Sequence, residues 1–343
     1  MMEETIAMGA MLAVLSGLMN GSFTLPMRFL GRWEWENVWS IFITVACLLM
    51  PVAIITMVAP LSWALLADAP GPAIHIALLT GFAWGFGAIM FGQSVSAIGI
   101  SLANTLVLAI SSALGSFLPM LLLHRDKLTQ RTGRMILAGV VIQIFAIALC
   151  GWAGHLREKA AGISTERGNL VGRARSIGVG LLLATGAGVF SGIFNIGFAM
   201  AQPIAEYGRA SGLSDFSSTN LIWLVMLGAG LLPNLAFCIY LFRKNRSFSG
   251  FAKPGSFRLY SLSALMALLW GGSVFVYGAA APRLGALGTA IGWPLSLATG
   301  LVLANIIGLG LGEWRQAPRK ARNWMYAGIA ILLVAIIVLS RAS

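Results

Sequence analysis

The chain has 343 residues, of which 58% are hydrophobic and only 10% are charged, and its mean hydropathy is +0.86. This composition excludes a soluble globular protein and indicates an integral membrane protein. The formal net charge of +12 would suit a nucleic-acid partner, but the basic residues gather in short loops between apolar runs, as topology signals beside anionic lipid do.

Long runs without Asp, Glu, Lys or Arg follow one another along the chain and predict ten membrane-spanning helices. A helix needs about 20 apolar residues to cross the hydrocarbon, so the run over 69–124 has to hold two spans, with a break near Ser94 to Gly99. The runs cover 5–27, 37–67, 69–124, 135–156, 176–205, 216–242, 259–282, 284–312 and 323–340. The expected fold class is therefore an all-α integral membrane protein.

The first run follows MMEET, which lacks the basic region and the cleavage site of a signal peptide. We therefore expect residues 6–25 to form a retained first span. Cys47, Cys150 and Cys238 lie singly in apolar runs, so their spacing suggests small core residues and neither a disulfide framework nor a metal site. No cofactor is expected.

Two motifs of the first half return in the second half. SGLMNGSF (16–23) matches AGVFSGIF (187–194) at a spacing of 171, and FAWGFGAIMFG (82–92) matches LWGGSVFVYG (269–278) at a spacing of 186, with a Trp-Gly pair in both copies. Chance similarity between Gly-rich helices is the alternative. We predict two related five-helix repeats, 1–157 and 177–343, joined by a cytoplasmic loop over 158–176. An odd number of spans per repeat makes the second repeat inverted, as in many secondary transporters.

The distribution of basic residues predicts the orientation. If ten spans alternate, 16 of the 23 Lys and Arg lie on one side, in the loops at 27–38, 155–176, 243–258 and 312–323. The positive-inside rule makes this side cytoplasmic and both termini periplasmic. The segment HRDKLTQRTGR (124–134) runs against the rule, because it places four basic residues on the outer side.

Polar and aromatic residues inside the spans are the candidates for a binding site. Ser101, Thr105, Ser112 and Ser116 follow helical periodicity and draw one polar stripe, which either lines a path or bonds back to its own helix. Aromatic rings beside amides suit a sugar, whose C–H face packs on a ring while its hydroxyls pair with amides. The predicted substrate-binding residues are Asn20, Trp84, Gln93, Asn104, Thr105, Asn195, Trp270, Tyr277 and Trp293.

Tryptophans near the span ends are expected to be interfacial anchors: Trp33, Trp35, Trp39, Trp63, Trp314 and Trp324. Coupling to protons needs a titratable group, and the carboxylates lie at the mouths of spans rather than within them. Glu36, at the start of the second span, and Glu206, just after the sixth, are the candidates for proton coupling. Solvated surface charge is the alternative for both.

Four segments resemble the L-rhamnose–proton symporters of the drug/metabolite transporter superfamily: GRWEWENVWSIF (31–42), FAWGFGAIMFG (82–92), GRMILAGVVIQIFAIALCGWAGHLREKAAGI (133–163) and LLPNLAFC (231–238). The resemblance extends in order over nearly the whole chain. It implies ten helices, a bacterial inner-membrane location and sugar uptake coupled to protons. Family members can carry His and Asp around the eighth and ninth spans, whereas residues 279–294 here contain neither.

These observations favour a secondary active transporter that imports L-rhamnose or a closely related sugar with protons. The alternatives are an exporter of small metabolites or drugs with the same fold, and a passive channel or structural membrane protein. An enzyme is not expected, because His75, His124 and His155 are scattered near span ends. The expected partners are the sugar, protons and the lipid bilayer, with no nucleic acid, and the sequence does not indicate an oligomeric state.

Overall fold

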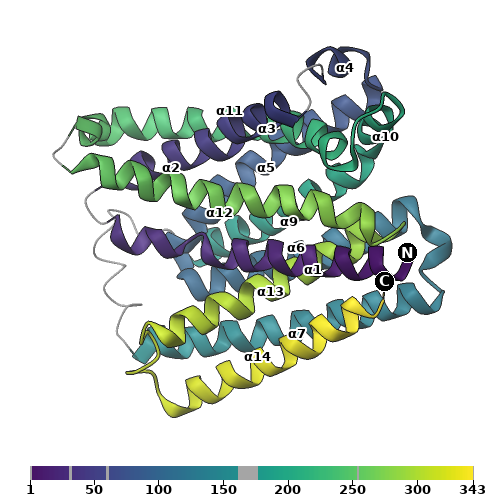
Figure 1. The fold of residues 1–343 in the computed structure, drawn as a ribbon. Coiled ribbons are helices and arrows are strands. Elements are labelled where there is room, and N and C mark those ends of the chain that lie inside the picture. The colour runs from purple at the N-terminus through teal and green to yellow at the C-terminus, as the bar shows by residue number, and fades with distance from the viewer. Residues whose placement is uncertain (1, 31–32, 59–61, 161–176, 253–254, 343) are drawn as a thin grey trace.

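The computed structural model describes residues 2–30, 33–58, 62–160, 177–252 and 255–342, in which every element is helical (Figure 1). Ten helical segments of this part of the chain are long and apolar enough to span a membrane. They are α1 (Met2–Ser22), α2 with η2 and α3 (Trp35–Thr44, Val45–Leu49 and Met50–Val58), α5 (Gly71–Ile98), α6 (Ile100–Leu123), α7 (Arg131–Ala160), α9 with α10 (Ile177–Met200 and Gln202–Ala210), α11 (Asp215–Asn245), α12 (Ser256–Arg283), α13 (Gly288–Gly310) and α14 (Arg319–Ser340). The ten predicted spans are confirmed.

Short helices lie between the spans: η1 (Leu25–Phe29), α4 (Ser62–Asp68), η3 (Arg125–Lys127) and η4 (Ser247–Ala252). Both termini lie at the same end of the bundle (Figure 1), as an even number of spans requires.

The break expected between the third and fourth spans falls at Gly99, which ends α5 and precedes α6. Its φ of 84° is a conformation that residues with a β-carbon rarely adopt. Other boundaries differ by a few residues. The first span ends at Ser22, and α7 continues to Ala160, three residues into the loop predicted over 158–176. Residues 161–176 of that loop lie outside the described residues, and α9 covers Ile177–Met200.

The second span contains a local irregularity with an identifiable cause. Pro51 has no N–H to donate to the carbonyl four residues earlier, and the helix widens just before it. Over Val45–Leu49 the backbone adopts a π-helix, and the N–H of Met50 bonds to the carbonyl of Val45. Such single turns of π-helix are often found at functional sites.

The helices pack in related sets of contacts between the two halves of the chain. In the first set, α9 packs on α5 and α6, and α11 packs on α5. In the second, α1 packs on α12 and α13, and α2 with η2 packs on α12. Within each half α6 packs on α7 and α13 packs on α14, while α7 packs on α14 between the halves.

Glycines bring several of these backbones into direct contact. A β-carbon on Gly81 of α5 would overlap the Met226 carbonyl of α11, and one on Gly21 of α1 would overlap the Gly300 carbonyl of α13. Lipid provides no hydrophobic driving force between helices, so close backbone approach of this kind holds a membrane bundle together.

Two of the predicted interfacial tryptophans are instead part of the core. Trp33 is 8% exposed and donates to the Gly250 carbonyl at 3.1 Å, and Trp314 is 4% exposed beneath the guanidinium of Arg157. The anchor interpretation was wrong for these two, because distance along a span does not show which helices cover its end. Trp324 is 37% exposed, and the three cysteines are buried and free.

Candidate functional site

Trp84 and Trp270, one from each copy of the repeated motif, stack on each other near the midpoints of α5 and α12. Their ring centroids are 5.2 Å apart and their planes are within 13° of parallel. Trp84 also lies 5.0 Å from Phe194 of α9, and Trp270 lies 5.7 Å from Phe42 of α2. Four helices thus meet through aromatic rings at one place.

The aromatic rings continue along α9, α11 and α12. Trp223 stacks on Phe198 with centroids 4.3 Å apart, and it lies 5.5 Å from Phe194. Tyr277 lies 5.6 Å from Phe198, and Trp293 of α13 lies 5.4 Å from Tyr277. We call this set the aromatic centre: Trp84, Phe194, Phe198, Trp223, Trp270, Tyr277 and Trp293.

Asn195 is the polar link between four helices at the aromatic centre. Its amide nitrogen donates to the carbonyls of Gly115 on α6 and Thr289 on α13, at 2.7 and 3.2 Å. Its amide oxygen accepts a hydrogen bond from the Tyr277 hydroxyl of α12. Asn195 is fully buried, and this pairing satisfies each of its polar atoms, as burial requires.

Hydroxyl groups hold the Trp293 ring in place, and Gly115 leaves room for it. Its indole N–H donates to Ser111 at 3.1 Å, and the Ser111 hydroxyl donates to Ser191 of α9 at 2.8 Å. A β-carbon on Gly115 would come within 2.6 Å of the Trp293 ring. Gly115 therefore gives the indole room to lie against α6.

Asn234 makes a similar link on the α11 side and was not among the predicted site residues. It accepts from the Trp39 indole at 2.9 Å and donates to the carbonyls of Gly85 and Gly230, at 3.2 and 2.9 Å. Its only sequence signal is a buried amide within an apolar run, which does not distinguish a link between helices from a ligand contact.

Trp223 and Asn220 carry polar groups that have no partner among the described residues. The Trp223 indole N–H and both amide atoms of Asn220 are unpaired, and the two side chains are at most 1% exposed. The two residues are three apart on α11, so they lie on adjoining parts of one helix face. Unpaired groups beside aromatic rings are available to the hydroxyls of a ligand. Asn220 and Trp223 were not among the predicted substrate-binding residues, although their spacing of three is visible in the sequence.

At Ser101 and Thr105 the predicted polar stripe of α6 faces α7. Thr105 donates to its own helix at the Ser101 carbonyl, 2.7 Å away, and packs against Gly151 of α7. Asn20 lies beside Gly300 at the contact between α1 and α13, while Gln93 and Asn104 are half-buried on α5 and α6. The residues that meet at the aromatic centre are therefore Trp84, Asn195, Trp270, Tyr277 and Trp293.

The two predicted coupling carboxylates have opposite surroundings. Glu36 is 2% exposed and accepts hydrogen bonds from the Asn245 amide at 2.9 Å and from the Ser247 hydroxyl. Glu206 on α10 is exposed. A third carboxylate, Glu158 near the end of α7, is 8% exposed and accepts from Ser101. Sequence reasoning missed Glu158, because it stands among the charges of a span end.

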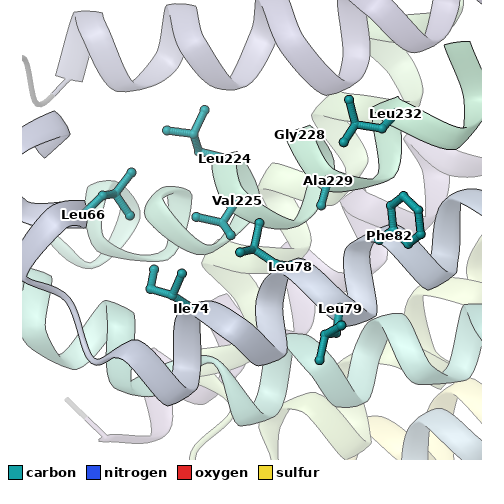
Figure 2. A pocket seen from close by; sticks show the side chains of 10 residues that line it. All are labelled: Leu66, Ile74, Leu78, Leu79, Phe82, Leu224, Val225, Gly228, Ala229 and Leu232. Carbon is teal, nitrogen blue, oxygen red and sulfur yellow. The ribbon is translucent and has the colours of Figure 1, made fainter.

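A separate hollow lies on the outer side of α5 and α11. It has a volume of about 560 Å³ and is open on one side, and Figure 2 shows its lining: Leu66, Ile74, Leu78, Leu79, Phe82, Leu224, Val225, Gly228, Ala229 and Leu232. All of these residues are apolar, so the hollow offers no side chain that could pair with a sugar hydroxyl. It suits lipid chains better than a polar solute.

Comparison with known proteins finds similarity over nearly the whole chain. Residues 2–343 match the family described as L-rhamnose-proton symport protein (RhaT). An L-rhamnose-proton symporter of Escherichia coli and one of Cronobacter sakazakii are each 28% identical over 341 residues, covering 97% of both chains. The match agrees with the resemblance carried by the quoted segments.

Proposed function

Because the chain belongs to the L-rhamnose-proton symport protein family, we propose that it imports L-rhamnose, or a closely related sugar, together with protons by alternating access. The observation that carries this proposal is the stacking of Trp84 on Trp270 beside buried amides. Sugars present an apolar C–H face that packs on such rings and a rim of hydroxyls that needs polar partners.

The sugar would bind at the aromatic centre. Trp84 and Trp270 supply ring faces, and the unpaired groups of Trp223 and Asn220 supply a donor and an amide for hydroxyls. In the conformation described, each of the two tryptophan rings covers one face of the other. Sugar binding therefore requires their rings to separate, which couples the ligand to the relative position of α5 and α12.

Alternating access follows from an inverted repeat, which we propose for residues 1–157 and 177–343. Gly17 and Gly21 of α1 pack on α13, while the matched Gly188 and Gly192 of α9 pack on α6. The contacts of α9 with α5 and of α1 with α12 correspond in the same way. Rocking of one repeat against the other would expose the aromatic centre to each face in turn.

We place the protein in the bacterial inner membrane with both termini in the periplasm. Lys and Arg are in excess in the loops at one end of the spans, and such an excess marks the cytoplasmic side. This end also holds the buried Glu36, whose carboxylate accepts hydrogen bonds from Asn245 and Ser247. At 100 mV an entering proton contributes about 2.3 kcal/mol, which supports roughly fiftyfold accumulation of a neutral sugar.

The proposal is tested by uptake of labelled L-rhamnose into proteoliposomes that contain the purified protein, with and without an inward proton gradient. Accumulation that the gradient stimulates is the expected result. Gradient-insensitive entry would contradict the coupling, and no entry of L-rhamnose would contradict the substrate. A panel of labelled sugars in the same vesicles would then identify the sugar carried.

A further inference from the structure

A polar seam runs between α6 and α7, on a face of α6 other than the one that carries Ser111. At one end of the seam the Glu158 carboxylate accepts from the Ser101 hydroxyl at 2.9 Å and from the Ser101 N–H at 3.3 Å. Gly154 and Gly151 of α7 make room for the side chains of Ser101 and Thr105. The contacts fix the register of the two antiparallel helices.

Further along the same two helices, four polar atoms have no partner among the described residues. They are the hydroxyl oxygens of Ser112 and Ser116 and both amide atoms of Gln143, and all three side chains are 0% exposed. Steps of three or four residues lead from Glu158 to Gln143 on α7 and from Ser101 to Ser112 and Ser116 on α6. The register therefore places Gln143 opposite the two serines.

The unpaired atoms point to water as the ligand of this part of the seam. A buried polar group without a partner is unfavourable, and a water molecule relieves this by bonding to several such groups at once. Gln143 presents a donor as well as an acceptor. Water matches that combination, whereas a bare cation would bind oxygens only.

We propose that the α6–α7 seam is the route of the coupled proton, with water held at Gln143, Ser112 and Ser116 and the proton held at Glu158. This inference rests on the proposed function. Glu158 accepts a proton and becomes a neutral carboxylic acid, and it returns the proton to water on the cytoplasmic side. Ile147 of α7 lies between Gln143 and the Glu158 end of the seam and packs in the same cluster as Leu108 of α6, so an apolar turn closes the route in this conformation.

Helix α6 explains how the proton would act on the sugar site. One of its faces holds Ser101 at Glu158, and the other holds Ser111 and Gly115 at Trp293 and Asn195. A carboxylate at the start of a helix is favoured while it is charged. Protonation weakens this attachment of α6, so the same helix transmits the change to the aromatic centre.

The other charged groups near this end leave Glu158 free for the role. Arg157 is paired with Glu313 at 2.9 Å and lies over the Trp314 ring, and α6 carries no titratable side chain. The remaining groups are His155 and Lys159 of α7, Arg315, and the first residues of α14, Arg319, Lys320 and Arg322. No ion pair between Glu158 and a Lys or Arg is formed within the described part of the chain.

The test uses Glu158→Gln and Gln143→Leu in proteoliposomes, with Glu313→Gln as the matched control at the same end. Exchange of labelled for unlabelled L-rhamnose at equal pH needs only the sugar site, so it should stay within about twofold of wild type in every variant. Gradient-driven accumulation and L-rhamnose-dependent proton entry should fall at least tenfold in Glu158→Gln and severalfold in Gln143→Leu. Both should be normal in Glu313→Gln.

Normal proton entry in Glu158→Gln or in Gln143→Leu would overturn the inference, as would equal loss of exchange and accumulation in purified, monodisperse protein. The second variant keeps the test decisive if the first does not fold. The wild-type protein separates this inference from the proposed function. If wild type itself shows no L-rhamnose-dependent proton entry, the proposed coupling fails. If wild type shows it and the two variants match wild type, the seam alone is excluded.

Discussion

The two copies of the Trp-Gly motif lie in unlike surroundings, although their tryptophans stack on each other. On α5, Gly81 and Gly85 lie directly against the backbone of α11, at the carbonyls of Met226 and Gly230. On α12, the matched Gly271 faces the thioether of Met50, whose sulfur would be 2.8 Å from an added β-carbon. The first interface consists mainly of backbone together with the rigid ring of Pro233, and the second of a flexible side chain.

The difference indicates where the molecule can move. Backbone-to-backbone contacts between α5 and α11 have no adjustable atoms, while Met adapts to changes in its surroundings. The Met50 side of the α12 interface also contains the π-helix at Val45–Leu49, a local irregularity that a helix can shift or lose. We infer that α12 moves relative to α2 when the tryptophans separate, and that α5 and α11 stay together.

The largest effect, loss of folding, is expected at the interface between α5 and α11. Gly81→Val would place a branched side chain on the Met226 carbonyl, so we expect no folded protein in detergent extracts. Gly228→Val is the matched control, because a β-carbon on Gly228 has open space around it. Size-exclusion chromatography of both variants checks this. A monodisperse Gly81→Val protein with normal thermal stability would show that the interface is not rigid.

Substitution of the two matched glycines, Gly85 and Gly271, should give an effect of intermediate size on thermal stability. Gly85→Ala brings a β-carbon within 2.5 Å of the Pro233 ring and the Gly230 carbonyl. Gly271→Ala comes close only to the end of Met50 and is in ordinary contact with Ala46 at 3.6 Å. Overpacking against backbone costs about 1–3 kcal/mol, so we expect the Tm to fall by several degrees for Gly85→Ala and to stay nearly unchanged for Gly271→Ala. Equal Tm values would remove the distinction between the interfaces.

A smaller effect on thermal stability is expected at the contact between α2 and α11, one of the two helices that we infer to stay together. Trp39→Phe keeps a ring but loses the 2.9 Å hydrogen bond to Asn234, which costs about 1 kcal/mol. Thermal unfolding should show a modest fall in Tm while exchange of L-rhamnose continues. Trp324→Phe, at a position that is 37% exposed, is the control. A change in exchange without a change in Tm would instead place Trp39 at the ligand.

The sequence allowed the spans and the break at Gly99 to be predicted, because hydropathy is a local property of the chain. It did not allow the partner of each helix face to be predicted. The predicted polar stripe has the expected periodicity but faces α7 at Ser101 and Thr105, and periodicity states only that residues share a face. The contact of Glu158 with Ser101 and the stacking of Trp223 on Phe198 likewise depend on which helix lies opposite.

The central claim is that the two repeats share one sugar site at the stacked tryptophans, and equilibrium binding of labelled L-rhamnose to purified variants tests it most directly. Loss of a stacking ring is worth about 1.4 kcal/mol, so Trp84→Ala and Trp270→Ala should each bind about tenfold more weakly than wild type. Trp324→Ala should bind as wild type does. Wild-type affinity in Trp270→Ala, in protein of unchanged fold, would contradict the account.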